Sequence, residues 1–507
     1  MDKHTDTYTT TTVTGGFLFP HLAEEDTREP VFTVTLPAVW SNMLHTYFSK
    51  AAAGTTTTNT THQEQEEPPP IEIGFLFLSL SYWIELLVLL VATLSVAAGV
   101  GFFLYKTIIQ PKQERTLQAY LIGWGLIVPF WISWPVWLLS VVDVRNAIFR
   151  FLVGGIAPII CCFRTTEAIY GFCPKHATRS ARDFCFYFAT VPIVARVKDD
   201  DKQNGNNNNN NNNNNANVNK SSSSTSIAGR TIGDPIPCSN SKKMKHLGTF
   251  LGLLFFTGAL QSILTPHLHL NVFGMGIEGV ADQDVEWHAT QRYFTWQLYA
   301  NSALQALLFQ MYLTMYLEAL TFAFSVLTGF EAEPAMDNPL LESTSPTDFW
   351  GRRWNTVVHT VLKNGVYKPL RKCAVLPRAA AVLATFVASG VFHEWILVLV
   401  FVTPTTDDHW RWLVFETGRK DVHYDPSYGG SIVFFSWQAL LIGLELSFGR
   451  TRFVRRIAKI LPKQVKTAIV VGMGVPLAHF FLEPYVTSGF FFQHGAPALP
   501  MVVRVVR

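Results

Sequence analysis

Residues 117–142, LQAYLIGWGLIVPFWISWPVWLLSVV, decide the fold class, because these 26 residues contain no Asp, Glu, Lys or Arg. An α-helix needs only about 20 apolar residues to cross the hydrocarbon core of a bilayer. The whole chain has 49% hydrophobic and only 15% charged residues, against roughly 25% charged residues in soluble domains. The sequence therefore predicts an integral membrane protein and argues against a soluble globular enzyme.

Other apolar stretches extend this prediction along the chain. Residues 146–163 form a weaker span, because Arg150 near its start would have to snorkel to the interface. Residues 71–80 and 183–195 are too short to cross, and we expect interfacial or re-entrant helices there. The predicted fold is an all-α, polytopic integral membrane protein with about eight transmembrane helices. The stronger expected spans are 82–104, 117–142, 247–264, 297–317, 379–402, 431–448 and 467–485.

Composition changes abruptly at residues 198–246, which read KDDDKQNG, then an unbroken run of Asn at 206–215, then SSSSTS. Such a polar tract cannot bury enough apolar surface to order itself, so we expect a disordered linker. It separates an N-terminal membrane module, 71–197, from a C-terminal one, 247–487. The Thr-rich residues 1–70 are expected to be disordered, and 488–507 form a tail.

Loop charges predict the orientation, because short loops rich in Lys and Arg stay in the cytosol. The loop 449–466 carries seven Lys and Arg residues and no acid, so we expect it in the cytosol. Counting spans backwards places 331–378 in the cytosol and 403–430 on the opposite side. If 146–163 spans the membrane, the linker is cytosolic and the first seventy residues lie in the lumen.

Net charge and cysteines exclude several classes of protein. The formal net charge of +3 is too near neutral for a protein that neutralises phosphates, so we expect no nucleic-acid partner. The six cysteines show neither a CxxC pair nor zinc-finger spacing, and the chain lacks an HExxH motif. We therefore expect free thiols and no metal site.

His393 is the sharpest chemical candidate. It lies in SGVFHEW, residues 389–395, near the middle of the span 379–402, where an imidazole stays neutral and can accept a proton. The alternative is a histidine that only hydrogen-bonds a neighbouring helix for packing. Glu394 lies about 100° around the helix and cannot orient His393 on one face, whereas Ser389 lies one turn earlier and can.

A second cluster is DFWGRRWN, residues 348–355. Trp350 and Trp354 are i, i+4 neighbours, and such rings favour the bilayer interface. Arg352 and Arg353 would then lie at headgroup level, where guanidinium groups bind phosphates. The alternative is an interfacial anchor helix on anionic lipid. Asn355 does not fit a simple anchor, because its amide requires buried partners.

Weaker polar positions lie on two expected spans. Gln297, Asn301 and Gln305 recur at i, i+4 and i+8, on a face that points to protein or to a wet cavity rather than to lipid. Gln438 and Glu445 share a face at i, i+7. Either set can hold helices together or contact a substrate.

These elements together resemble the membrane-bound O-acyltransferase family, and specifically its wax-synthase-like branch. The sequence NPL at 338–340 precedes DFWGRRWN, and the His of SGVFHEW follows its Asn by 38 residues. The resemblance is close over 338–394 and loose over the surrounding helices.

The resemblance implies transfer of a fatty acyl group from acyl-CoA to the hydroxyl of a long-chain alcohol, with His393 and Asn355 as the catalytic residues. It implies acyl-CoA as co-substrate with no separate cofactor, a long-chain alcohol or other lipid hydroxyl as acceptor, membrane lipids as surroundings, and the endoplasmic reticulum membrane as location. His393 would act as general base, and Asn355 would donate to the oxyanion or orient the thioester. The side chains expected to bind substrate are Trp350, Arg352, Arg353, Trp354, Phe392 and Glu394.

Other activities remain open at this point. A diacylglycerol or sterol acceptor, or a short-chain acyl donor, fits the same family. A transporter in which His393 and Glu394 form a proton relay is an alternative of another class, since intramembrane ionisable residues also mark pumps. The sequence shows no internal repeat or symmetric pair of broken helices, which argues against that class.

Overall fold

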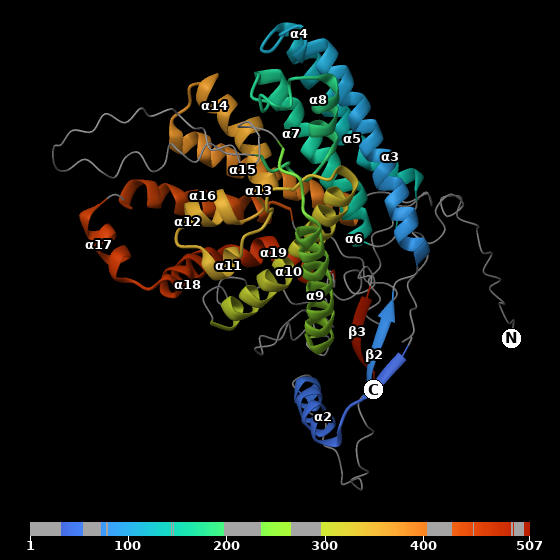
Figure 1. Ribbon diagram of the computed structural model, residues 1–507. Helices are drawn as coiled ribbons and strands as arrows, with labels where there is room; N and C mark the ends of the chain where they lie inside the picture. Colours follow the sequence, from blue (N-terminus) through green and yellow to red (C-terminus); the bar gives the residue numbers. More distant parts are fainter. Residues whose placement is uncertain are drawn as a thin grey trace, which may run out of the picture.

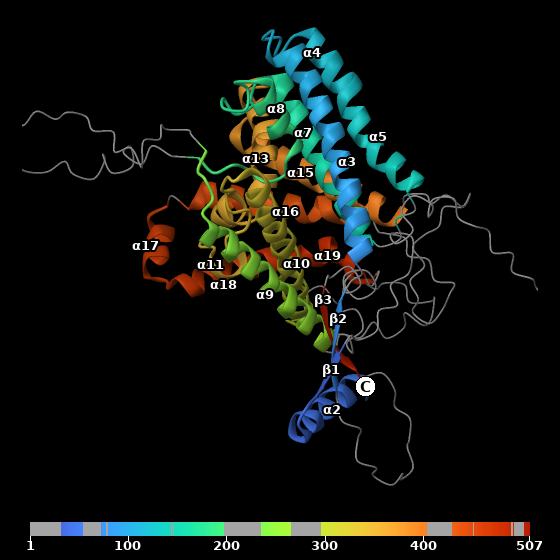
Figure 2. The same cartoon turned by 45° about the vertical axis from the view of Figure 1, so that its right-hand side comes forward.

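A computed structural model describes residues 32–53, 72–77, 80–142, 144, 147–196, 235–264, 296–402, 428–449, 451–487, 490 and 501–506. Most of these residues are helical, and the helices form one body (Figures 1 and 2). The 198–234 part of the expected linker lies outside the described residues. Pro235 and Pro237 pair as isolated bridges with Arg196 and Phe330, so the part of the expected linker from 235 to 246 is structured, contrary to the prediction.

The helices fall on either side of that linker. Before it lie α3 (Leu80–Leu104), α4 (Leu117–Ile122), α5 (Val128–Val141), α6 (Ala147–Arg150), α7 (Ala157–Tyr170) and α8 (Ala181–Ala189). After it lie α9 (Asn240–Leu264), α10 (Trp296–Thr328), α11 (Pro339–Glu342), α12 (Pro346–Asp348), α13 (Thr356–Leu362), α14 (Lys368–Lys372), α15 (Arg378–Leu397), α16 (Gly430–Phe448), α17 (Arg452–Ile460), α18 (Lys463–Gly474) and α19 (Ala478–Thr487).

Shorter wound segments extend or join these helices. The π-helical turns are η2 (Tyr105–Ile109), η3 (Gly123–Ile127), η4 (Phe151–Ile156), η9 (Phe349–Arg353), η10 (Lys363–Tyr367) and η11 (Val398–Val402). A 3₁₀ turn, η12 (Val475–Leu477), joins α18 to α19. Turn η2 continues α3 without a break, and η12 joins α18 to α19. Each of these two runs is therefore one long apolar helical segment.

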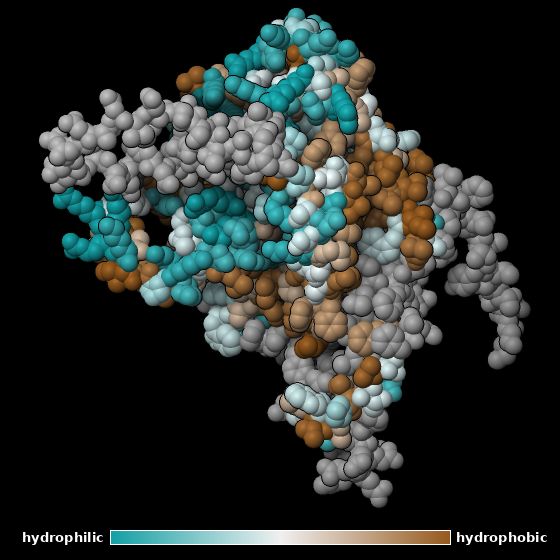
Figure 3. Space-filling view, in the orientation of Figure 1, coloured by the Kyte–Doolittle hydropathy of each residue, from teal (hydrophilic) through white to brown (hydrophobic). Residues whose placement is uncertain are grey.

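The chain is a multi-pass, predominantly α-helical membrane protein. Helix α3 turns large apolar side chains such as Leu87, Val91 and Phe102 outward, as a lipid-facing surface requires. Apolar residues cover this flank in Figure 3. Within the described residues, six helices are long and apolar enough to cross a membrane: Leu80–Ile109, Leu117–Val141, Trp296–Thr328, Arg378–Phe401, Gly430–Phe448 and Lys463–Val486.

Two of the expected eight spans do not meet that criterion. Residues 247–264 lie in α9, whose helix begins at Asn240 with three lysines in its first six residues. Of the expected span 146–163, residues 147–163 lie in the continuous run from α6 to α7. Arg150 there is only 1% exposed and donates from Nη1 to the Val400 carbonyl at 2.9 Å. The expectation that Arg150 snorkels to the interface was therefore wrong, because it is buried against protein instead.

The segments before and after the linker pack around a shared core. One cluster of buried apolar residues joins Leu86 and Phe149 of the first segment to Phe434 and Phe481 of the second. Thr166 on α7 also donates to the Gly365 carbonyl at 3.0 Å. Residues far apart in sequence therefore support each other, and they position the helices that carry the site.

The two short apolar stretches have different outcomes. Residues 183–195 begin in the short helix α8, whose Phe184 and Phe188 are fully buried and pack on α3. Residues 71–80 were expected to be a helix, which was wrong: Glu72–Phe77 form strand β2. This strand pairs antiparallel with β1 (Phe32–Thr35) and with β3 (Met501–Val506). Strand partners satisfy its backbone polar groups, which a lone short apolar segment could not do.

The first and last segments also contain more structure than expected. Within 1–70, strand β1 is followed by helix α2 (Ala38–Ala53), and within 488–507 lies strand β3. The expectation of disorder across 1–70 was therefore wrong for these elements. In Figures 1 and 2 the sheet and α2 lie beneath the helical body, close to the C-terminus.

Candidate active site

A cavity of about 960 Å³ lies within the helical body. This volume falls in the range of small-molecule sites, which are mostly apolar with a few converging polar groups. Both expected catalytic residues, His393 and Asn355, line it. Of the expected substrate contacts, Trp350, Arg352, Trp354 and Phe392 line it too, whereas Arg353 and Glu394 lie outside its wall.

His393 projects from α15 into the cavity. Its Nδ1 lies 2.7 Å from the backbone carbonyl oxygen of Ser389, one turn earlier. A carbonyl can only accept, so Nδ1 carries the hydrogen and the neutral ring has its lone pair on Nε2. Among the described residues, nothing hydrogen-bonds that Nε2. The expected orienting residue was Ser389, and it acts through its backbone rather than its hydroxyl.

Aromatic rings hold the imidazole in place. Phe435 of α16 stacks on His393 with centroids 4.6 Å apart and an interplanar angle of 26°. Phe481 of α19 meets the same ring edge-on at 5.2 Å. These two rings and the Nδ1 hydrogen bond restrict the ring, so Nε2 is presented to the cavity in one orientation.

Glu394 points away from the cavity, toward the start of α16. Its Oε1 accepts a hydrogen bond from the Ser431 backbone N–H at 2.8 Å. The helices are close here, because a Cβ on Gly390 would lie 2.6 Å from the Ile432 Cα. The carboxylate therefore caps α16 against α15. This position gives no support to a proton relay between Glu394 and His393.

Removing the Glu394 carboxylate should mainly affect stability. Glu394→Ala leaves the Ser431 N–H, which is 2% exposed, without its acceptor, and a buried unsatisfied donor costs about 1–3 kcal/mol. Glu394→Gln keeps an acceptor oxygen and should stay close to the parent in thermal unfolding of the detergent-purified protein. An alanine variant with parental stability but no activity would instead give Glu394 a chemical role.

Asn355 has a structural role that the sequence did not reveal. It adopts left-handed backbone angles, φ 38° and ψ 71°, and its Oδ1 accepts from the Val358 N–H at 3.1 Å as the N-cap of α13. Asn tolerates this conformation and is a favoured N-cap. The cap occupies the amide oxygen and leaves the Nδ2 hydrogens as the donors that an oxyanion needs.

The two tryptophans form an aromatic wall, although not on an α-helix. Their segment is the π-helical turn η9, and the chain is extended at Trp354. Trp350 and Trp354 still meet at 5.8 Å, and Trp354 stacks on Phe349 at 5.4 Å. Trp350 also donates from Nε1 to Gln438 Oε1 at 3.2 Å. This bond holds Trp350 beside α16, so the wall is rigid rather than a free interfacial anchor.

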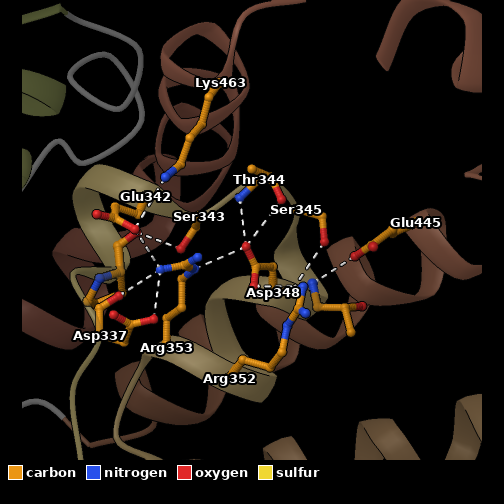
Figure 4. A network of polar contacts seen from close by, with 12 residues as sticks. Asp337, Glu342, Ser343, Thr344, Ser345, Asp348, Arg352, Arg353, Glu445 and Lys463 are labelled. Atoms are coloured by element: carbon orange, nitrogen blue, oxygen red, sulfur yellow. Dashed lines mark hydrogen bonds and ion pairs between the residues drawn. The ribbon is translucent and has the colours of Figure 1, made fainter. Parts of the chain in front are cut away.

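The two arginines differ in their surroundings (Figure 4). Arg353 has a 17% exposed side chain and contacts three carboxylates, those of Asp337 at 2.9 Å, Glu342 at 3.1 Å and Asp348 at 3.1 Å. Arg352 has a 75% exposed side chain, and among the described residues it forms an ion pair with Asp348 alone, at 2.9 Å. Arg353 therefore holds the segment together, while Arg352 remains accessible at the cavity wall.

Asp348 is the centre of this polar network. Burial by itself would raise the pKa of its carboxyl. The hydrogen bond from the Thr344 backbone and the Arg353 guanidinium outweigh that effect and hold the pKa below its usual value. Thr347 next to it donates its backbone N–H to Glu445 Oε2 on α16 at 2.7 Å, and Lys463 on α18 pairs with Glu342 at 3.2 Å. The network thus ties the segment to two membrane-spanning helices.

His359 is a cavity residue that sequence reasoning missed. It lies on α13, four residues after Asn355, and lines the same cavity. Burial, and then the charge of Lys363, lowers the pKa of His359 to about 4, so the ring is neutral at neutral pH. Its only sequence signal is the spacing from Asn355. It provides a matched control for His393.

Three of the weaker polar positions, Asn301, Gln305 and Gln438, are buried, whereas Gln297 and Glu445 are partly exposed. Asn301 and Gln305 are buried, at 2% and 8% exposed, as their helical spacing predicted. Gln438 and Glu445 both line the cavity. Both polar atoms of the Gln438 amide form hydrogen bonds: Oε1 accepts from Trp350 Nε1, and Nε2 donates to the Gly474 carbonyl at 3.3 Å. It therefore supports the aromatic wall.

Comparisons with known proteins find similarity over the part of the chain that carries Asn355 and His393. Residues 333–416 match the model of the membrane bound O-acyl transferase family. The Arabidopsis thaliana protein named Probable long-chain-alcohol O-fatty-acyltransferase 9 is 34% identical over 138 residues, which are 26% of this chain and 34% of that protein. Probable long-chain-alcohol O-fatty-acyltransferase 3 is 29% identical over 192 residues, 36% of this chain and 48% of that protein.

A relative with a different printed activity is also similar. Acyl-CoA--sterol O-acyltransferase 1 of the same plant is 43% identical over 89 residues, 17% of this chain and 26% of that protein. The chain spans between a third and a half of the length of the first two relatives that it matches. The matched segment contains Asn355, His393 and most of the polar network, and over this segment the chain is similar to the membrane bound O-acyl transferase family.

Proposed function

We propose that this protein transfers a fatty acyl group from acyl-CoA to the hydroxyl of a long-chain alcohol, forming a wax ester within the membrane. The observation that carries the proposal is His393, whose Nδ1 is held by the Ser389 carbonyl while Nε2 faces a largely apolar cavity. The printed activities of the relatives supply the substrate classes. The endoplasmic reticulum membrane is the proposed location.

His393 acts as the general base in the proposed mechanism. Its Nε2 takes the hydroxyl proton while the alcohol oxygen attacks the thioester carbonyl carbon, because an alcohol is a poor nucleophile until a base removes that proton. The Nδ2 hydrogens of Asn355 donate to the oxyanion that develops. The C–S bond then breaks, and the proton on His393 goes to the departing CoA thiolate. Ester and CoA are the products, and the imidazole returns to its neutral form.

The cavity wall divides into parts that suit the two ends of acyl-CoA. Arg352, Lys363 and Arg378 are exposed basic residues on its wall, and they suit the CoA phosphates. Other parts of the wall are formed by apolar side chains of α10, α16 and α18, including Leu313, Leu441 and Val471. These suit the hydrocarbon chains of donor and acceptor.

The neighbouring arginines give a matched pair of variants. Arg352→Ala should raise the KM for acyl-CoA about two- to fivefold with little change in kcat, because one exposed ionic contact is worth up to about 1 kcal/mol. Arg353→Ala should lower stability by about 1–3 kcal/mol, because the buried Asp348 loses one of its two guanidinium partners and the carboxylates of Asp337 and Glu342 each lose the same contact. Initial rates against acyl-CoA concentration and thermal unfolding measure the two effects. Parental kinetics in Arg352→Ala would contradict a role in CoA binding.

A sterol acceptor is the second candidate, supported by the similarity to a sterol acyltransferase. The deciding experiment supplies radiolabelled acyl-CoA and a panel of acceptors to membranes that contain the parent protein or His393→Gln. Label in wax ester, lost in the variant, supports the proposal. Label that appears only in sterol ester would establish the second candidate, and no labelled ester with any acceptor would reject acyl transfer.

A further inference from the structure

Helix α17 (Arg452–Ile460) contributes no residue to the cavity wall. It connects α16, which ends at Phe448, to α18, which begins at Lys463, and both of these helices are long and apolar enough to cross a membrane. Figures 1 and 2 both show α17 lying across the ends of α16 and α18. A connection this short keeps α17 at the level where the two spans leave the bilayer.

The two faces of α17 differ sharply in chemistry. Its sequence is RFVRRIAKI. At 100° per residue, Phe453, Ile457 and Ile460 fall on one face. The basic residues form a second face, on which Arg455 lies nearly opposite the apolar residues and Arg456 lies at the edge beside Ile460. That basic face consists of Arg452, Arg455, Arg456 and Lys459. In Figure 3 hydrophilic atoms lie along this helix with hydrophobic atoms beside them.

The apolar face of α17 is uncovered. Phe453 is 73% exposed and Ile460 is 75% exposed, and every residue of the helix is exposed. A single exposed apolar residue is common on protein surfaces. Three of them on one helical face form an apolar strip, and such a strip is more stable when it is buried against another apolar surface. Thr451 caps the helix, with Oγ1 accepting from the Val454 N–H at 3.4 Å, so the strip belongs to a defined helix.

We propose that α17 lies in the plane of the membrane surface and binds anionic phospholipid. Its apolar strip enters the boundary between headgroups and acyl chains, and its basic side chains contact lipid phosphates. Two observations select this occupant over a soluble protein. The flanking spans place the helix at the bilayer, and residues 449–466 carry seven basic residues and no acid, a charge complementary to an anionic leaflet.

The test uses the full chain in lipid nanodiscs that contain phosphatidylcholine and phosphatidylserine. An environment-sensitive fluorophore is attached at Ile460→Cys in a Cys373→Ser background, because Cys373 is the exposed native cysteine among the described residues. Labelled Cys373→Ser protein alone gives the background signal. Traces of nitroxide-labelled phosphatidylserine or nitroxide-labelled phosphatidylcholine then quench the probe according to which lipid lies next to the helix. Arg455→Cys is the matched position on the basic face, nearly opposite the apolar strip.

We expect the probe at position 460 to be quenched more than the probe at 455, and more by labelled phosphatidylserine than by labelled phosphatidylcholine. Replacing Arg455 or Lys459 by Gln should lower the preference for phosphatidylserine by up to about fivefold per charge, since each basic residue at an anionic surface contributes on that scale. Equal quenching by both lipids would overturn the anionic selectivity. A probe at 460 that neither lipid quenches would overturn membrane binding. Both results are independent of acyltransferase activity.

Discussion

His393→Gln should lower the rate of ester formation by about 10²–10⁴-fold, the usual contribution of a general base. Glutamine keeps much of the size and hydrogen bonding of histidine but cannot take a proton at neutral pH. The variant should remain inserted and abundant, because the aromatic rings around position 393 pack a side chain of similar size. His393→Ala should lose as much activity but should be less stable, because it leaves a vacancy between Phe435 and Phe481.

His359→Gln is the control for this experiment. Its parent side chain lines the same cavity and is also neutral at neutral pH, but it lies on α13 beside Asn355. We expect this variant to retain activity within a few-fold of the parent protein. Radiolabelled acyl-CoA incorporated into ester measures both variants at equal protein levels. If His359→Gln were inactive and His393→Gln active, the base would be His359 and the proposed mechanism would be wrong.

Replacements of Asn355 should separate its two roles. Asn355→Asp keeps an oxygen that caps α13 and tolerates the left-handed backbone, but it loses the amide hydrogens. We therefore expect stability close to the parent and a rate at least about 10²–10³-fold lower, the cost of one oxyanion donor. Asn355→Ala should show the same loss of rate and also a loss of about 0.5–2 kcal/mol in stability from the missing cap.

Asn355→Gly completes this series, because glycine adopts a φ of 38° without strain and replaces a capping residue at a cost of only a few tenths of a kcal/mol. Its stability should lie above that of Asn355→Ala, while its rate should match it. Initial rates and thermal unfolding of the purified variants give both quantities. Near-parental activity in Asn355→Asp would show that Asn355 serves the reaction only as a helix cap.

Much of the helical architecture could be predicted from the sequence. A segment that crosses the lipid must form its backbone hydrogen bonds within itself, and the thickness of the bilayer sets how many consecutive apolar residues it needs. Six of the predicted spans coincide with apolar helices of the described structure. The same local reasoning failed for Glu72–Phe77, where strand partners at Phe32–Thr35 and Met501–Val506 lie far away in sequence. It also failed for Arg150, whose partner is the Val400 carbonyl.

The motifs of the candidate site were visible in the sequence, and the helical period alone separated Glu394 from His393. Only the tertiary structure decided what each side chain contacts. It placed Arg353 among three carboxylates and left Arg352 exposed, and it turned Glu394 to the start of α16. It also added His359 to the cavity wall. Apolar length and helical period are properties of neighbouring residues, so the sequence determined the membrane helices. Ion pairs, caps and cavity walls join segments distant in the chain, so they are defined only when the helices pack.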